Sequence, residues 1–89
     1  MMERVFTVQN KLGLHARPAA LFVGLVEKFD VVVTISNGQE TVNGKSIMGI
    51  LMLGAVGGTL LKIIIEGPQA PEAMMACEKF FSQQEEELG

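Results

Sequence analysis

Two spacings of apolar residues alternate along this chain, and they limit the folds that it can adopt. Apolar residues occur at every second position, as in strands, over residues 3–8, 31–36 and 60–66. A further short strand is expected over residues 39–42, because it follows the hairpin signal Asn37-Gly38. Apolar residues follow helical spacing over residues 16–28, 46–53 and 70–84. The resulting order, β-α-β-β-α-β-α, predicts an α+β open sandwich in which helices cover one face of an antiparallel sheet.

Each strand is expected to turn alternate residues toward the core. This inward set comprises Phe6, Val8, Val31, Val33, Ile35, Val42, Leu61, Ile63 and Ile65. Asn37-Gly38 predicts a tight hairpin turn, because both residues tolerate a positive φ. The last helix is expected to bury Ala73, Met74, Cys77, Phe80 and Phe81 and to fray into a solvated tail at residues 85–87.

Length and composition indicate one small domain, residues 1–89, with an aliphatic core, because the chain has no Trp and no Tyr. A single cysteine excludes an internal disulfide, and no signal peptide is apparent, so we expect a cytoplasmic protein. The net charge of −3 argues against nucleic-acid binding. We expect no bound metal, because the only histidine and Cys77 lack metal-ligand spacing. We also expect a monomer that binds no cofactor and does not insert into a membrane.

The candidate for chemistry is the segment Gly13-Leu14-His15-Ala16-Arg17-Pro18, which contains that histidine. Pro18 fits only the first turn of a helix, which makes His15 the N-cap. The backbone N–H groups of Ala16 and Arg17 and the helix dipole then favour an anion beside the imidazole. The Arg17 guanidinium suits phosphate oxygens. The segment therefore predicts that His15 accepts and donates a phosphoryl group, which Arg17 stabilises.

A purely structural histidine is the alternative, although Ser, Thr, Asp or Asn would cap a helix better. The side of the helix that carries Arg17 also carries Ala20, Leu21 and Gly24. Leu21 is more easily explained there by a partner than by the core. We therefore expect these three residues to belong to a partner interface.

Residues 46–61 contain no charged side chain. Ser46 is a good N-cap for the short helix that begins there. Ile50 and Leu53 share one arc of this helix, and a helix of two turns cannot bury a second arc against the same sheet. The second arc is an expected interaction surface, formed by Ile47, Met48, Leu51 and Met52. A wholly buried helix is the alternative.

Acidic residues are absent from residues 4–26 and from residues 41–65, and five of the ten lie after residue 70. The two candidate segments are therefore mildly positive. This distribution suits a phosphoryl group and an acidic protein partner, although chance clustering of few charges is the alternative.

The run Gly13-Leu14-His15-Ala16-Arg17-Pro18-Ala19 is similar to the active-site motif of HPr, the histidine-containing phosphocarrier of the bacterial sugar phosphotransferase system. Residues 42–54, Val-Asn-Gly-Lys-Ser-Ile-Met-Gly-Ile-Leu-Met-Leu-Gly, resemble the segment around the regulatory serine of that family. The resemblance covers essentially the whole chain. It implies a four-stranded antiparallel sheet of order 1-4-2-3 with three helices on one face. It also implies that the start of the first helix lies beside the second helix.

The resemblance further implies a phosphoryl carrier with a transient phosphohistidine rather than a stand-alone enzyme. HPr-like proteins accept the group from enzyme I, ultimately from phosphoenolpyruvate, on Nδ1 of the histidine, here His15. They pass it to enzyme IIA domains of sugar permeases. The match at Ser46 implies regulatory phosphorylation by HPr kinase/phosphorylase and a catabolite-control transcription factor as a partner, with a simple N-cap serine as the alternative.

Three other functions stay open. A nitrogen-branch phosphocarrier would share His15 and the fold. A Crh-like regulator would lack the histidine, so His15 counts against it. A pure interaction domain would leave His15 inert. Two positions depart from the family pattern: Gly24 and the pair Val56-Gly57 stand where relatives often carry longer or basic residues.

Overall fold

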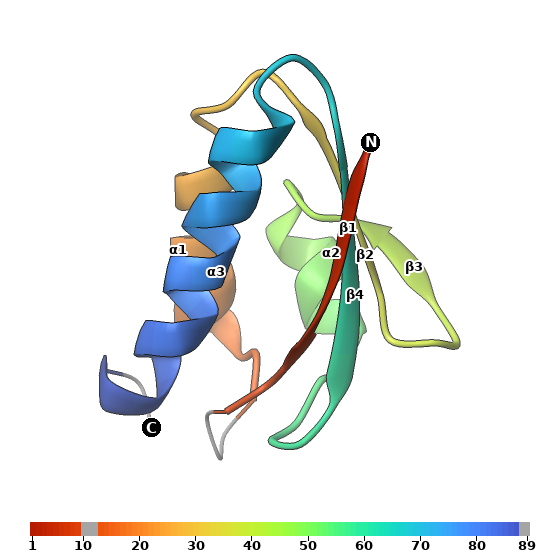
Figure 1. Ribbon diagram of the computed structural model, residues 1–89. Helices are drawn as coiled ribbons and strands as arrows, with labels where there is room; N and C mark the ends of the chain where they lie inside the picture. Colours follow the sequence, from red (N-terminus) through yellow and green to blue (C-terminus); the bar gives the residue numbers. More distant parts are fainter. Residues whose placement is uncertain (10–12, 88–89) are drawn as a thin grey trace.

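The structure is a computed structural model that describes residues 1–9 and 13–87 (Figure 1). The chain forms β1 (Met2–Thr7), α1 (Ala16–Val26), β2 (Val32–Ser36), β3 (Thr41–Asn43), α2 (Ile47–Met52), β4 (Leu60–Glu66) and α3 (Ala70–Glu87). All strand pairs are antiparallel, and the sheet order is β1-β4-β2-β3. The predicted element order, fold class and strand order are therefore confirmed.

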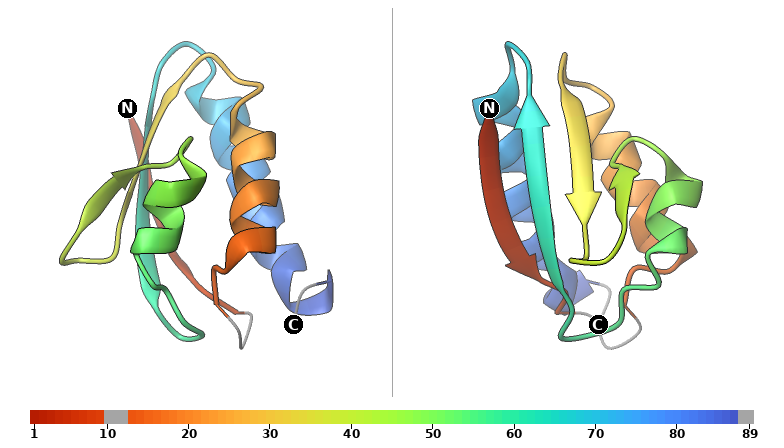
Figure 2. Two further views of the ribbon diagram at one scale, coloured as in Figure 1. Left: turned by 180° about the vertical axis from the view of Figure 1, so that it is seen from behind. Right: turned by 90° about the vertical axis from the view of Figure 1, so that its right-hand side faces the viewer.

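The helices lie on one face of the sheet and leave the other face open (Figure 2). Strand β4 explains this division, because Leu61, Ile63 and Ile65 are fully buried and alternate with the exposed Leu60 and Lys62. Eight of the nine residues that were expected to face inward are buried, and the ninth, Val42, is half-buried against the core. No helix in the described part of the chain is long and apolar enough to cross a membrane.

Aromatic side chains join α1 and α3 to the edge strand β1. Phe6 stacks on Phe81 with 4.7 Å between the ring centroids. Phe22 meets the edge of Phe80 with 5.4 Å between the centroids. Cys77 lies in the same core, and burial raises the pKa of its thiol from 9.0 to about 12. Since the thiolate is the nucleophilic form, Cys77 is not a candidate for catalysis.

The hairpin between β2 and β3 forms as predicted, but its turn is longer than the two residues between the expected strands. Gly38 has a φ of +95°, whereas no non-glycine residue that the structure describes has a positive φ. Asn37 acts through its side chain instead, because its Oδ1 accepts hydrogen bonds from the backbone N–H of Gln39 at 2.9 Å and of Glu40 at 2.8 Å. This Asx turn occupies residues 37–40, so β3 begins only at Thr41.

Several element boundaries differ from the predictions. Helix α1 ends at Val26 rather than at residue 28. Strand β1 begins at Met2, which pairs with Ile65 of β4. Helix α3 continues through Glu87 rather than ending at residue 84, because the Gln and Glu residues of its last turns are good helix formers. Fraying of the tail at residues 85–87 stays a prediction.

Candidate functional site

His15 is the N-cap of α1, as predicted, with a φ of −90° and a ψ of −172°. Its carbonyl oxygen accepts a hydrogen bond from the N–H of Ala19 at 3.0 Å. Within the described part of the chain, its side chain makes no capping hydrogen bond. The half-buried imidazole is therefore not used to hold the helix end.

The first turn of α1 presents backbone donors beside this imidazole. Pro18 is buried in this turn and has no N–H. The helix begins its own bonding at Ala19, which leaves the N–H groups of Ala16 and Arg17 without an acceptor inside the helix. Both residues are exposed, and the first turn contains no acidic residue. The arrangement can hold an anion on the imidazole through backbone donors and a guanidinium.

The segment that precedes His15 is fastened to the loop that follows α2. The N–H of Leu14 donates to the carbonyl oxygen of Ala55 at 2.9 Å. Gly13 has a φ of +76°, and a Cβ at this position would overlap the Ala55 carbonyl and the Cα of Val56. Our sequence reasoning missed this contact, for which the only signal was the glycine. The predicted loop residues Asn10, Lys11 and Leu12 lie outside the described residues.

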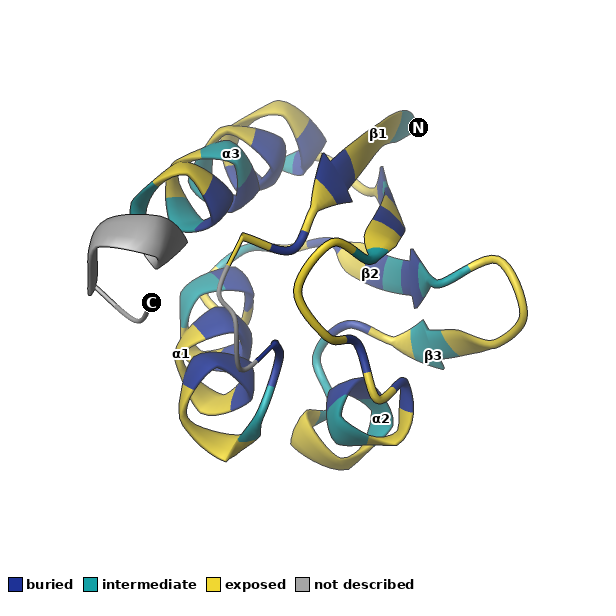
Figure 3. Cartoon of the chain, turned by 90° about the horizontal axis from the view of Figure 1, so that it is seen from below, coloured by how far each residue is buried: buried dark blue, intermediate teal, exposed yellow. Residues whose placement is uncertain are grey.

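Helices α1 and α2 lie side by side at the end of the molecule where α1 begins (Figure 3). Lys45 lies at the start of α2, and its Nζ donates to the carbonyl oxygen of Phe29, just after the end of α1, at 2.9 Å. The two helices therefore run in opposite directions. Ser46 lies toward the end of α1, and the loop after α2 lies toward His15.

We group five apolar side chains of these two neighbouring helices, all exposed except the half-buried Leu51, as the apolar patch. It comprises Leu21 of α1 and Ile47, Met48, Leu51 and Met52 of α2. Met48 is 68% exposed and Met52 67%, whereas Ile50 and Leu53 are buried as expected. The alternative of a wholly buried helix is therefore wrong. Leu51 is less exposed than predicted, because it packs partly against the core.

The remaining interface candidates also lie at the surface. Ala20 and Gly24 are exposed on the same helix as Leu21. Val56 is exposed in the loop fastened to Gly13, so it extends the apolar surface toward His15. Sequence reasoning noted Val56 only as a departure from the family pattern.

Ser46 caps α2 as predicted. Its Oγ accepts a hydrogen bond from the backbone N–H of Gly49 at 3.0 Å. The side chain is only half-buried, and the exposed Ile47 and Met48 follow it directly. Ser46 therefore has a structural role and is also partly accessible from solvent.

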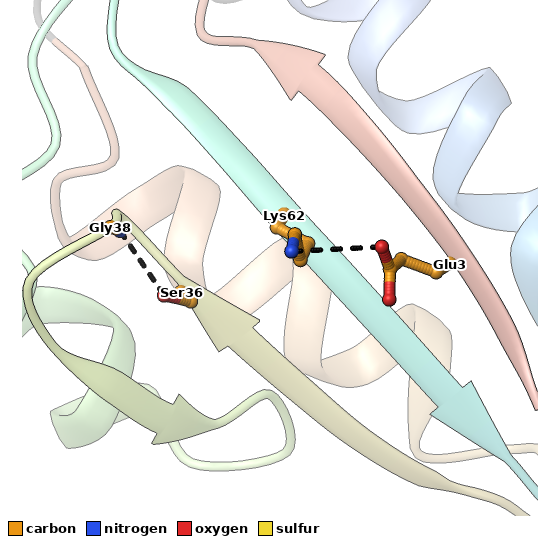
Figure 4. Close-up of polar contacts among 4 residues, drawn as sticks. All are labelled: Glu3, Ser36, Gly38 and Lys62. Atoms are coloured by element: carbon orange, nitrogen blue, oxygen red, sulfur yellow. Dashed lines mark hydrogen bonds and ion pairs between the residues drawn. The ribbon is translucent and has the colours of Figure 1, made fainter.

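The open face of the sheet offers no comparable chemistry. A shallow hollow there is lined by Val5, Ser36, Asn37, Gly38, Leu60 and Lys62. Its polar groups are already paired, since Lys62 lies 3.6 Å from a carboxylate oxygen of Glu3 and Ser36 Oγ accepts from the N–H of Gly38 (Figure 4). Among the described residues, no group of three or more His, Cys, Asp or Glu side chains could hold a metal ion. The His15 segment is therefore the candidate site.

Comparisons with known proteins agree on one family. The sequence profile described as "PTS HPr component phosphorylation site" matches residues 2–83. The phosphocarrier protein HPr of Xylella fastidiosa is 43% identical over 81 residues, which cover 91% of each chain. The HPr-like protein Crh of Halalkalibacterium halodurans is 39% identical over 84 residues, which cover 94% of this chain and all of the relative. An HPr structure from Thermoanaerobacter tengcongensis has a TM-score of 0.92 at 40% identity and covers 98% of both chains. The chain belongs to the HPr family of phosphocarriers of the bacterial phosphotransferase system.

Proposed function

We propose that this chain accepts a phosphoryl group from enzyme I on Nδ1 of His15 and transfers it to an enzyme IIA domain of a sugar permease. The observation that supports this most strongly is the position of His15. It is the N-cap of α1, its side chain is not used for capping within the described part of the chain, and Arg17 stands two residues further on. Family membership supports the phosphotransferase system as the setting.

In the transfer step, a bond forms between phosphorus and the His15 nitrogen while the bond between phosphorus and the donor imidazole of enzyme I breaks. Donor and acceptor are both imidazoles, so the step is close to balanced and reversible. The N–H groups of Ala16 and Arg17 and the Arg17 guanidinium hold the phosphoryl oxygens, on which charge is concentrated during transfer. The second transfer, to enzyme IIA, repeats this exchange with the chain as donor.

The apolar patch is the proposed docking surface for both partners. A carrier must bind two proteins in turn and release each, and a shallow surface beside the histidine suits short-lived complexes. Arg17 adds a positive charge that favours acidic partner surfaces. Lys45 contributes less to docking, because its Nζ is engaged by the Phe29 carbonyl.

The proposal is tested by incubating the chain with phosphoenolpyruvate and purified enzyme I and measuring its intact mass. We expect a gain of one phosphoryl group that is lost in acid and stable in base. Addition of an enzyme IIA domain should then move the group to that domain. Failure with several enzymes I would contradict the proposal and favour an interaction domain with an inert His15.

Ser46 supports a second proposal, regulation by phosphorylation through an ATP-dependent HPr kinase/phosphorylase. A phosphate on this partly accessible side chain would carry about two negative charges at one end of the apolar patch and repel an acidic partner. A catabolite-control transcription factor would be the partner that reads the modified form.

The Ser46 proposal predicts that Ser46→Asp slows phosphoryl acceptance from enzyme I by about tenfold or more, because a negative charge would face an acidic partner. Ser46→Asn is the matched control, since Asn caps a helix as well as Asp does but has no charge. Initial rates of acceptance measured for both variants would test this. Equal rates for the two variants would leave Ser46 as an N-cap only.

The partner separates the remaining alternatives. A nitrogen-branch phosphocarrier would accept the group on the same His15 and would prefer the enzyme I and enzyme IIA of that branch. A Crh-like regulator would bind a transcription factor and needs no phosphohistidine. We favour the sugar branch, and competition between the enzymes I of the two branches would decide between the sugar and nitrogen branches. We propose that the chain acts as a monomer.

A further inference from the structure

We propose that Met48 and Met52 form an oxidation-sensitive modification site that controls partner docking at the apolar patch. A peroxide would convert their thioethers to sulfoxides and weaken docking while the fold stays intact. The proposal rests on the proposed function, because it assumes that the patch binds the phosphotransfer partners.

The two methionines combine high exposure with a position inside the apolar patch, whereas the equally exposed Met75 lies on α3. Met48 is 68% exposed and Met52 67% exposed. They lie four residues apart, which places them on the same side of α2. They are the two most exposed residues of the apolar patch. They belong to α2, which lies beside α1, the helix capped by His15. An oxidant in solution therefore reaches both side chains without any opening of the structure.

The stability of α2 does not depend on either methionine. Ile50 is the buried residue of this helix, and Ser46 caps it through Gly49. Oxidation at the patch would therefore leave the fold in place. Met74, by contrast, is 1% exposed in the core, where a sulfoxide would disrupt packing. Met48 and Met52 can therefore be oxidised in the folded state, whereas Met74 is protected by burial.

The chemistry is a two-electron oxygen transfer. The thioether sulfur attacks the terminal oxygen of the peroxide, the O–O bond breaks, and the products are a methionine sulfoxide and water or an alcohol. The sulfur is oxidised and the peroxide is reduced. The sulfoxide is polar, so a partner that buries it in an apolar contact leaves its oxygen without a hydrogen-bond donor. Methionine sulfoxide reductases reverse the change, because both positions stay exposed.

The experiment treats the full chain with limiting hydrogen peroxide, maps the sulfoxides by peptide mass spectrometry and measures phosphoryl acceptance from enzyme I. With sulfoxides at both positions, we expect the KM for the chain to rise by about tenfold or more, which corresponds to roughly 1.4 kcal/mol of lost docking energy. The kcat at saturation should change little, because His15 and Arg17 are untouched. The midpoint of unfolding should also stay within a few degrees of that of the unoxidised chain, and treatment with sulfoxide reductases should restore the KM.

Two variants serve as controls. Met48→Leu/Met52→Leu keeps the patch apolar but cannot form sulfoxides there, so its KM should not respond to peroxide. Met75→Leu removes an equally exposed methionine, 67% exposed on α3 and outside the patch, so this variant should respond as the native chain does.

An unchanged KM with both sulfoxides present would overturn the proposal, as would an equal loss in the double variant. Failure of the unoxidised chain to accept a phosphoryl group would instead refute the proposed function, and this inference would fall with it. The measurement on untreated protein therefore distinguishes the two failures.

Discussion

His15→Ala is expected to abolish phosphoryl acceptance from enzyme I while leaving the free energy of unfolding within about 0.5 kcal/mol of the native value. The loss should be complete, because the chain has only one histidine and the substitution removes the nucleophile itself. Stability should change little, since the His15 side chain is half-buried and makes no capping hydrogen bond within the described residues. A loss of function without a loss of stability is typical of a residue retained for chemistry.

Intact mass after incubation with enzyme I and phosphoenolpyruvate measures the first effect, and urea unfolding measures the second. His15→Gln is a useful second variant, because it keeps a polar side chain of similar reach but has no imidazole. Both variants should stay at the unmodified mass. An acid-labile phosphoryl group on either variant would show that another residue accepts it and would contradict the proposed role of His15.

Gly13→Ala is expected to lower the free energy of unfolding by about 2–4 kcal/mol. The φ of +76° at Gly13 is costly for a residue with a Cβ, and that Cβ would overlap the Ala55 carbonyl and the Cα of Val56. Both obstacles are backbone atoms, so no side-chain rotation can relieve the overlap. The loop after α2 must therefore move away, which weakens the hydrogen bond between Leu14 and Ala55.

Gly24→Ala is the matched control for this prediction. Gly24 lies inside α1, and a Cβ there would meet nothing within 4 Å. Alanine should therefore raise the free energy of unfolding by about 1 kcal/mol through its better helix propensity. Urea denaturation of both variants tests the pair, and Gly13→Ala should also accept the phosphoryl group more slowly because it displaces His15. Equal stability of Gly13→Ala and the native chain would contradict the role assigned to this contact.

The parts of the fold that depend on neighbouring residues were predictable. Alternation in the segment from Leu60 to Glu66 identified both β4 and its buried face, since successive strand side chains point to opposite faces. Pro18 placed the start of α1 and made His15 its N-cap, because proline fits only the first helical turn. Ser46 marked the start of α2 in the same way. The strand order came from the family resemblance and not from these patterns.

Structural details were less predictable where one residue could adopt either of two conformations or environments. Asn37 could have supplied a positive φ or a side-chain acceptor, and the structure uses the acceptor, so the turn occupies four residues. Leu51 lies between the buried and exposed arcs of α2, and only the packing of this helix on the core decides how far it is covered.

By itself, the sequence determined where the strands and helices form, which of their faces are apolar and where the only histidine stands relative to a helix end. Each of these follows from interactions within a few residues along the chain. Only the tertiary structure decided that Leu14 bonds to Ala55 and that Lys45 reaches Phe29. These contacts join segments far apart in the chain and leave no periodic signal, because they arise when separate elements pack on the same face of the sheet. That packing brings α2, with its exposed methionines, beside the helix that begins at His15.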